Sequence, residues 1–229
     1  MTMDTGTPNG SQHIEALRKL RNLTESVTLS KFSEHDPELR LIGTSLSALY
    51  DAGTCRRQCH GGGHILESLC GRAYNLSAAA LELMVSGYYD EALNLIRSIG
   101  ELSNLLIMSI IDKAALAAWL SSDTKTRIQK FSPAAIRKIL EASPEGKGLM
   151  YADKDWYSHF CEAYTHVTPD TTPNHHGEQA IVGGKFQQQG FLKVLEELTH
   201  IVTPIAMIIC RYFNFGDLLE ELETTIDRS

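Results

Sequence analysis

Apolar and polar residues recur with a helical period along most of this chain, and the period is clearest over residues 65–112. Within that span, two long apolar stretches meet at Ser86-Gly87-Tyr88, a sequence typical of a turn. Apolar side chains recur every three or four positions in both stretches, which places them on one broad face of a helix. Charged residues are few in both, as in the central helices of a bundle. The pattern therefore predicts two long helices folded into a central α-hairpin.

Shorter amphipathic segments precede and follow the predicted hairpin. A capping residue followed by proline marks the start of a helix, and this signal occurs at Asp36-Pro37 and at Ser132-Pro133. Residues 1–10 are polar, lack the apolar core of a secretion signal and are predicted to form a disordered tail. We therefore expect an all-α, single-domain helical bundle over residues 11–229. The helices predicted outside the hairpin span residues 11–28, 36–53, 114–120, 133–141, 155–166, 191–213 with a bend at Pro204, and 217–227.

A long segment over residues 167–190 interrupts this helical pattern. It is rich in Pro, Thr, Asn, Gly and Gln, and we expect at most one short strand in it, near residues 180–182. Loops longer than about 12–15 residues inside a compact domain are usually functional or disordered. The segment is therefore the expected contact surface for a protein partner.

The composition narrows the class of protein. The 229 residues are 43% hydrophobic and 21% charged, with a net charge of −7, so we expect a globular protein without an extended nucleic-acid surface, although a small basic site is compatible. The apolar run over residues 201–213 is shorter than the roughly 20 residues of a membrane-spanning helix and contains Arg211, so we expect no membrane partner. Five cysteines without disulfide spacing indicate free thiols and a cytoplasmic location.

A stripe of polar residues follows the second helix of the predicted hairpin. Asn94, Arg97, Glu101 and Asn104 fall within an arc of about 80° on a helix. If the chain turns near Gly87, Arg72 of the first helix lies beside Glu101, so that Arg72 and Arg97 bracket this carboxylate. The first helix carries its own stripe, made of Ser68, Arg72, Asn75 and Glu82.

Two interpretations of these stripes are open. Arginine is well suited to hold phosphate, which would make the seam between Arg72, Arg97 and Glu101 an anion site. Alternatively, both stripes face water, or the charges form an ion pair that fixes the register of the two helices.

His166 allows two interpretations as well. It lies at the end of a predicted helix, where it could act as a general acid or base near neutral pH or could interact with the helix dipole.

A cluster of metal-ligand residue types precedes the hairpin. The sequence reads Cys55-x3-Cys59-His60-x3-His64, with Cys70 six residues further on. The spacing differs from the Cys-x2-Cys of a zinc knuckle, and no second pair completes a site. We therefore predict no metal and no cofactor, and a metalloprotein built on these residues is a rival hypothesis. The sequence contains no phosphate-binding glycine loop, dinucleotide fingerprint or nucleophile elbow.

The hairpin resembles an uncharacterised bacterial helical family that is often likened to HEPN (higher eukaryote and prokaryote nucleotide-binding) domains. The similarity lies in a Gly-aromatic-x-x-Glu-Ala turn, which begins at Gly87, and in an Arg-Ser-x-x-Glu helix, here Arg97 to Glu101. The family also has a helix ending in His near a proline, to which residues 164–169 are similar. The resemblance covers about residues 66–169 and implies a HEPN-like bundle, binding of a nucleotide or RNA, and a homodimer.

Many HEPN domains are metal-independent ribonucleases, and the resemblance therefore implies weak activity of this kind. The chain departs from their Arg-x4–6-His motif, because residues 155–166 contain no arginine. A ribonuclease would thus need an arginine from another helix. We expect Arg72 and Arg97 to hold the phosphate, Glu101 to orient them and His166 to act as acid and base, with Asn94 and Asn104 as further ligand-binding residues. The alternative is a non-catalytic protein-interaction or scaffold module.

Overall fold

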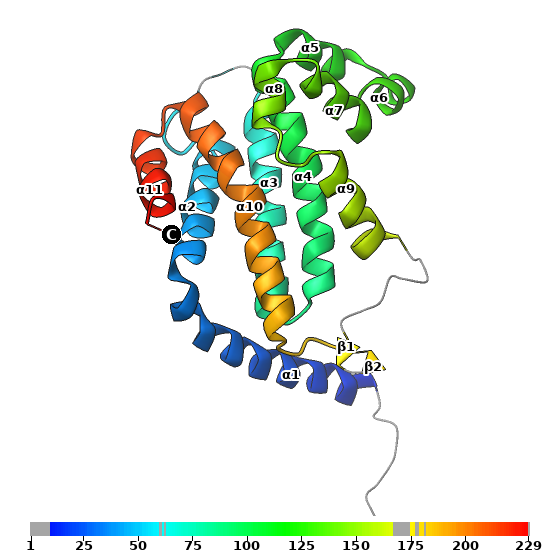
Figure 1. Ribbon diagram of the computed structural model, residues 1–229, viewed down its shortest axis with the longest axis vertical. Coiled ribbons are helices and arrows are strands. Elements are labelled where there is room, and N and C mark those ends of the chain that lie inside the picture. Colours follow the sequence, from blue (N-terminus) through cyan, green and yellow to red (C-terminus); the bar gives the residue numbers. More distant parts are fainter. Residues whose placement is uncertain are drawn as a thin grey trace, which may run out of the picture.

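The computed structural model describes residues 10–59, 61, 63–166, 175–176, 179–180 and 182–228, and these residues form an all-α bundle (Figure 1). Residues 1–9 of the predicted tail lie outside this range, whereas Gly10 is the first residue of a helix. The elements are α1 (Gly10–Lys31), η1 (Phe32–His35), α2 (Asp36–Gly53), α3 (Ile65–Val85), α4 (Tyr89–Ile111), α5 (Lys113–Ser121), α6 (Thr124–Lys130), α7 (Pro133–Glu141), α8 (Pro144–Leu149), α9 (Lys154–Phe160), η2 (Cys161–Thr165), β1 (His175–His176), β2 (Gln179–Ala180), α10 (Gln188–Phe213) and α11 (Gly216–Ile226).

The predicted central hairpin is confirmed. Helices α3 and α4 meet at Gly87, whose φ of 79° lies in the left-handed region that glycine adopts most readily. Helices α2, α3, α4 and α10 run side by side along the long axis of the molecule, while α1 crosses one end (Figure 1). The apolar stripes of these four helices supply most of the core. Its largest fully buried side chains include Leu49, Met84, Tyr89, Ile96, Ile99, Leu106 and Phe191.

Helix α4 is a long, apolar element of this core. Its length and hydropathy would suffice to cross a membrane, but half of its apolar window is buried inside the bundle. It packs against α3, α10, α7 and α9, so its apolar character suits a central position. The same helix carries Arg97 and Glu101, and their neighbours are therefore set by the helices around α4.

Helix α9 lies against α4 because Gly100 has no side chain. A Cβ atom at Gly100 would lie 2.6 Å from the ring of Trp156, so the missing methyl group lets this indole approach the helix. The indole Nε1 donates a 3.0 Å hydrogen bond to Glu197 of α10. Asp153 caps α9 by accepting a 2.9 Å hydrogen bond from the backbone N–H of Trp156. These contacts fix the face that α9 presents to α4.

The segment after α9 differs from the single helix predicted over residues 155–166. The α-helix ends at Phe160 and continues as a π-helical turn, Cys161–Thr165. The backbone N–H of His166 closes this turn with a 2.9 Å bond to the carbonyl of Cys161. A π turn changes the rotation per residue, and such turns occur frequently at functional sites.

Smaller differences concern helix ends and short elements. Asp36 is not the cap of α2, because it belongs to the first turn and follows His35, which makes no side-chain cap. Ser132 caps α7 as predicted. Helices α6 and α8 are too short to show a full apolar period and were not predicted. The expected short strand near residues 180–182 overlaps β2 at Ala180. It pairs antiparallel with β1, a second strand that was not expected.

Candidate functional site

The polar stripe of α4 faces the segment that contains α9 and η2. At one end, Asn94 Oδ1 accepts a 3.1 Å hydrogen bond from the Thr165 hydroxyl. At the other end, Asn104 Nδ2 donates a 2.8 Å bond to the carbonyl of Ala152. Asn104 is only 2% exposed, so the structure places it in the fold rather than at a surface open to ligands. The stripe is therefore a polar seam between two helical segments that is exposed at Asn94 and buried at Asn104.

The centre of this seam is a group of side chains that we call the Tyr157 cluster: Arg97, Glu101, Arg137, Tyr157 and Cys161. Arg97 forms a 2.9 Å ion pair with Glu101 one helical turn away. Its guanidinium also donates to the Tyr157 hydroxyl and, from Nε, to Cys161 Sγ at 3.1 Å. The Tyr157 hydroxyl in turn donates a 2.7 Å hydrogen bond to Glu101. The predicted pairing of Arg97 with Glu101 is present, with α9 and η2 supplying the remaining partners.

The environment of Tyr157 keeps its hydroxyl protonated. Burial, together with the hydrogen bond to Glu101 and the negative charge of that carboxylate, raises the pKa of Tyr157 to about 12. A protonated hydroxyl can accept from Arg97 and donate to Glu101 at the same time. Tyr157 thus acts as a neutral bridge between the two charged groups.

Arg137 of α7 brings a second cation to the same ring. Its guanidinium carbon lies 4.3 Å from the Tyr157 ring centroid, compared with 4.7 Å for Arg97. Arg137 is 7% exposed, and among the described residues its Nη1 has no hydrogen-bond partner. A buried guanidinium nitrogen without a partner is costly, and an anion would satisfy it.

A cavity of about 370 Å³ adjoins the cluster at Glu101, and we call it the Arg72 cavity. Arg72 is exposed, and within the described part of the chain it forms no ion pair. The predicted proximity of Arg72 and Glu101 therefore takes the form of a shared cavity rather than a salt bridge. The cavity is lined by Arg72, Leu76, Ser98, Glu101, Leu102, Leu105, Trp119, Phe131, Pro133 and Ile136.

His166 lies at the end of the π turn and is exposed. Its backbone N–H donates to Cys161, the residue whose thiol contacts Arg97. The structure thus places the predicted acid and base one π turn from the Tyr157 cluster. Residues 167–174, the first part of the predicted partner loop, lie outside the described range.

Three members of the Tyr157 cluster were not predicted from the sequence: Arg137, Tyr157 and Cys161. These residues belong to α7, α9 and η2, and no spacing along the chain connects them to Arg97. The only local signal was the position of Arg137 beside Ile136 on the apolar face of a short helix, where a charged residue is unusual.

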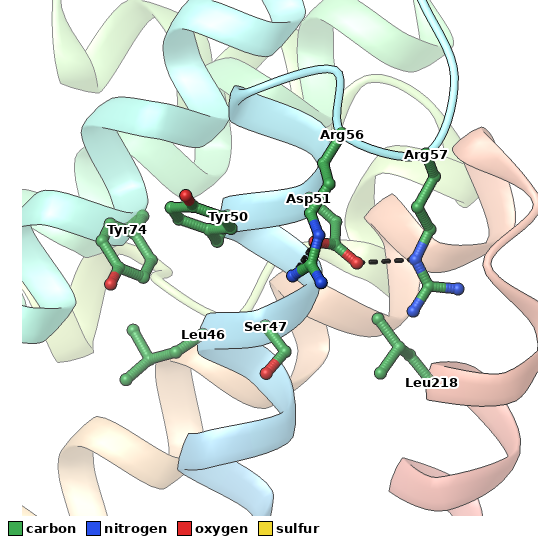
Figure 2. Close-up of a pocket in the computed structure, with 8 residues that line it drawn as sticks. All are labelled: Leu46, Ser47, Tyr50, Asp51, Arg56, Arg57, Tyr74 and Leu218. Carbon is green, nitrogen blue, oxygen red and sulfur yellow. Dashed lines mark hydrogen bonds and ion pairs between the residues drawn. The ribbon is translucent and has the colours of Figure 1, made fainter.

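A second cavity, of about 560 Å³, lies where the connection after α2 passes over α11 (Figure 2). The buried carboxylate of Asp51 is 2.6 Å from Arg57 Nε and 3.5 Å from Arg56 Nη1. Arg57 also pairs with Asp217 of α11 at 2.5 Å. Two arginines therefore meet two carboxylates, and the charges balance. This arrangement ties the connection to α2 and α11, whereas the Tyr157 cluster and Arg72 cavity hold three arginines against one carboxylate.

The same connection brings together three of the five cysteine and histidine residues noted in the sequence. Ligand atoms of Cys55, Cys59 and His64 all lie within 4.8 Å of one another. Cys70 is not part of this group, because it is buried in the core, and burial, with the charge of Glu67, raises the pKa of its thiol to about 12. His60 lies outside the described residues.

No protein-family model, curated protein or solved structure matches this chain. The family resemblance consequently stays an expectation that is carried by the hairpin residues.

Proposed function

We propose that this protein is a HEPN-like phosphate-binding protein that takes a nucleotide or a segment of RNA into the Arg72 cavity. The observation that carries the proposal is the charge around this cavity and the adjoining Tyr157 cluster. Arg72 and Glu101 line the cavity, Arg97 pairs with Glu101, and Arg137 contacts the ring of Tyr157, so that three guanidinium groups accompany one carboxylate. An excess of arginine beside a partly enclosed cavity favours the binding of an anion.

The lining of the cavity suits a nucleotide better than a simple anion. Its volume of about 370 Å³ lies within the range of about 300–1,000 Å³ that is typical of ligand pockets. Trp119 and Phe131 line it and are half-buried, so each offers part of its ring for a base to stack on. Arg72, unpaired within the described chain, would contact the phosphate, and Glu101 would hold Arg97 in place.

Binding is tested with a variant that leaves the internal cluster intact. Arg72→Ala removes an exposed side chain and should leave the free energy of unfolding within about 0.5 kcal/mol of wild type. A charge-assisted hydrogen bond contributes about 1.5–3 kcal/mol, so the Kd for nucleotides and short single-stranded RNAs should rise by about ten- to a hundredfold. Calorimetric titration measures this change. Arg18→Ala on α1, also exposed, is the matched control and should bind as wild type does.

Two results would overturn the proposal. One is a folded wild-type protein that binds neither nucleotides nor RNA at millimolar concentration. The other is an Arg72→Ala protein with the affinity of wild type. Trp119→Leu adds a second criterion. If a base stacks on the indole, this variant should bind nucleotides more weakly than wild type does but should bind inorganic phosphate equally well.

We propose weak metal-independent ribonuclease activity as the chemistry of this site. His166 would take the proton from a ribose 2′-hydroxyl as that oxygen attacks the phosphate, and would return it to the departing 5′-oxygen. Arg97 and Arg72 would offset the charge that develops on the phosphate. The exposure of His166 and the hydrogen bond from its backbone N–H to the carbonyl of Cys161 support this role. The reducing environment expected for the free thiols supports a cytoplasmic location.

The alternative function is a non-catalytic protein-interaction or scaffold module, in which the polar seam is purely structural. The apolar face of the hairpin is used inside the bundle, against α2 and α10. Helix α1, in contrast, exposes Ile14, Leu23, Val27 and Leu29 at one end of the molecule (Figure 1). Sedimentation analysis of wild type and Leu23→Glu tests whether α1 pairs two copies of the chain, in which case wild type is a dimer and Leu23→Glu is a monomer.

A further inference from the structure

The connection between α2 and α3, residues 54–64, gathers two thiols and an imidazole at the molecular surface. Cys55 Sγ lies 3.7 Å from His64 Nδ1, and Cys59 Sγ lies 3.9 Å from His64 Nε2. Cys59 and His64 are exposed and Cys55 is half-buried. The three side chains are thus close together and open to an ion from solvent.

The backbone of this connection takes a costly conformation to bring the side chains together. Cys55 has a φ of 53° and His64 a φ of 50°, both in the left-handed region. Outside glycine, the only other described residue in this region is Asn214, which caps α10 and is of a type that tolerates it. Left-handed backbone at a residue with a side chain costs of order 1–3 kcal/mol and tends to occur at functional sites. The two remaining left-handed residues, Cys55 and His64, both belong to the group of two thiols and one imidazole.

Contacts on the other side of the connection hold it in place. The backbone N–H groups of Cys55 and Arg56 bond to carbonyls at the end of α2. The side chain of Arg57 extends from the connection to the buried carboxylate of Asp51 (Figure 2). The segment between Cys55 and Cys59 is therefore anchored to α2, and the two thiols are positioned on a fixed part of the chain.

We propose that Cys55, Cys59 and His64 bind a zinc ion. With Zn–S bonds of about 2.3 Å and Zn–N bonds of about 2.0–2.1 Å, tetrahedral geometry places a ligand sulfur about 3.6 Å from a ligand nitrogen. With Nε2 of His64 as the ligand atom, Cys59 Sγ lies 3.9 Å from it, close to this value. Cys55 Sγ approaches the other ring nitrogen at 3.7 Å, and one ligand atom from each of the three residues lies within 4.8 Å of the others. Thiolate and imidazole are ligands that favour zinc over magnesium or calcium. On binding, each thiol releases its proton to solvent, and a water molecule takes the fourth position.

Glu67 supplies the neighbour that a zinc-bound histidine commonly has. Its carboxylate is 3.7 Å from His64 Nδ1 and only 7% exposed. Histidine ligands usually donate their second ring N–H to a carboxylate, which fixes the orientation of the ring. Coordination through Nε2, on the side of Cys59, leaves Nδ1 for this bond. Glu67 lies in the first turn of α3, so the ion would tie the end of α2 to the start of α3.

The test is the metal content of protein purified under reducing conditions without a polyhistidine tag. We expect about one zinc per chain by mass spectrometry of the elements. Replacement by Co²⁺ should give thiolate-to-cobalt charge-transfer absorption and the strong visible bands of four-coordinate cobalt. Cys59→Ser and His64→Asn, both at exposed positions, should lose the stoichiometric zinc and the charge-transfer bands. Asparagine tolerates the left-handed backbone conformation at position 64, so we expect the His64→Asn protein to fold.

His13→Asn on the exposed face of α1 is the matched control and should retain the metal. The proposal is overturned if folded wild type contains no zinc and takes up no Co²⁺ with thiolate bands. It is also overturned if Cys59→Ser and His64→Asn keep stoichiometric zinc, or if Cys55 and Cys59 are recovered as a disulfide from reducing buffer. None of these outcomes bears on nucleotide binding at the Arg72 cavity.

Discussion

The hydroxyl of Tyr157 donates a 2.7 Å hydrogen bond to the carboxylate of Glu101, and this bond joins α9 to α4. The same hydroxyl accepts a hydrogen bond from Arg97, the ion-pair partner of Glu101. The neutral hydroxyl of Tyr157 is therefore hydrogen-bonded to both members of an ion pair on the central helix α4. Because the ring of Tyr157 also contacts Arg137, this single residue connects three helices at the candidate site.

Removing only that hydroxyl should weaken the fold. Tyr157→Phe keeps the ring against Arg97 and Arg137 but leaves Glu101 without its 2.7 Å donor. Hydrogen bonds to charged groups contribute more than neutral ones, so we expect the free energy of unfolding in urea to fall by about 1–2 kcal/mol. Tyr151→Phe is the control, because Tyr151 is 40% exposed and its hydroxyl has no hydrogen bond within the described residues. Equal losses in both variants would contradict the role of the Tyr157 hydroxyl.

Two glycine-to-alanine changes should act in opposite directions. Gly100 is buried, and an added Cβ would meet Trp156 at 2.6 Å. Overpacking costs about 1–3 kcal/mol and outweighs the gain of up to about 1 kcal/mol that alanine brings to a helix. Gly43 in α2 is exposed with no atom within 4 Å of the added Cβ, so Gly43→Ala should show the gain alone. Thermal unfolding measures both, and a stabilised Gly100→Ala would show that α9 does not depend on this close approach.

The hairpin could be predicted from sequence because its determinants are local. The apolar period of α3 and α4, the sparse charges and the turn at Gly87 all lie within one continuous segment. The pairing of Arg97 with Glu101 could be predicted as well, because side chains four residues apart are neighbours on any α-helix. The register of a tight hairpin also predicted that Arg72 lies near Glu101, and both residues line the Arg72 cavity.

The partners of the α4 stripe could not be predicted in the same way. Helical periodicity tells which residues share a face, but not which other helix covers that face. Tyr157 lies beside Arg97 because Gly100 admits Trp156, and that contact joins residues 56 positions apart in the chain. Cys55 and His64 meet through two left-handed residues, a conformation that spacing alone does not reveal.

Stability should decrease at alkaline pH through the buried thiol of Cys70. Burial, with the charge of Glu67, raises the pKa of this thiol to about 12, whereas a thiol in the unfolded chain ionises near pH 8.5–9. Above pH 9 the unfolded state therefore loses a proton that the folded state retains, and the free energy of unfolding falls by up to about 1.4 kcal/mol per pH unit. This contribution is fully present below pH 8.5 and is lost as pH rises toward 12.

Urea unfolding at pH 8, 9 and 10 measures this dependence. Cys70→Ala removes the ionisable group, so its free energy of unfolding should fall less steeply between pH 9 and 10 than that of wild type. The comparison concerns the slope, because the cavity left by the smaller side chain lowers stability equally at each pH. Parallel pH profiles for the two proteins would show that Cys70 does not contribute.

The catalytic role proposed for His166 separates the ribonuclease from a protein that only binds. His166 is exposed, so His166→Ala should leave the free energy of unfolding within about 0.5 kcal/mol of wild type. Loss of a general acid and base typically lowers a rate by about 10²–10⁴-fold, and cleavage of single-stranded RNA should fall by that factor while RNA affinity is kept. His13→Ala, an exposed histidine on α1, should cleave at the wild-type rate. A folded His166→Ala protein with full cleavage activity would remove His166 from the mechanism, and the Arg72 cavity would then be a binding site alone.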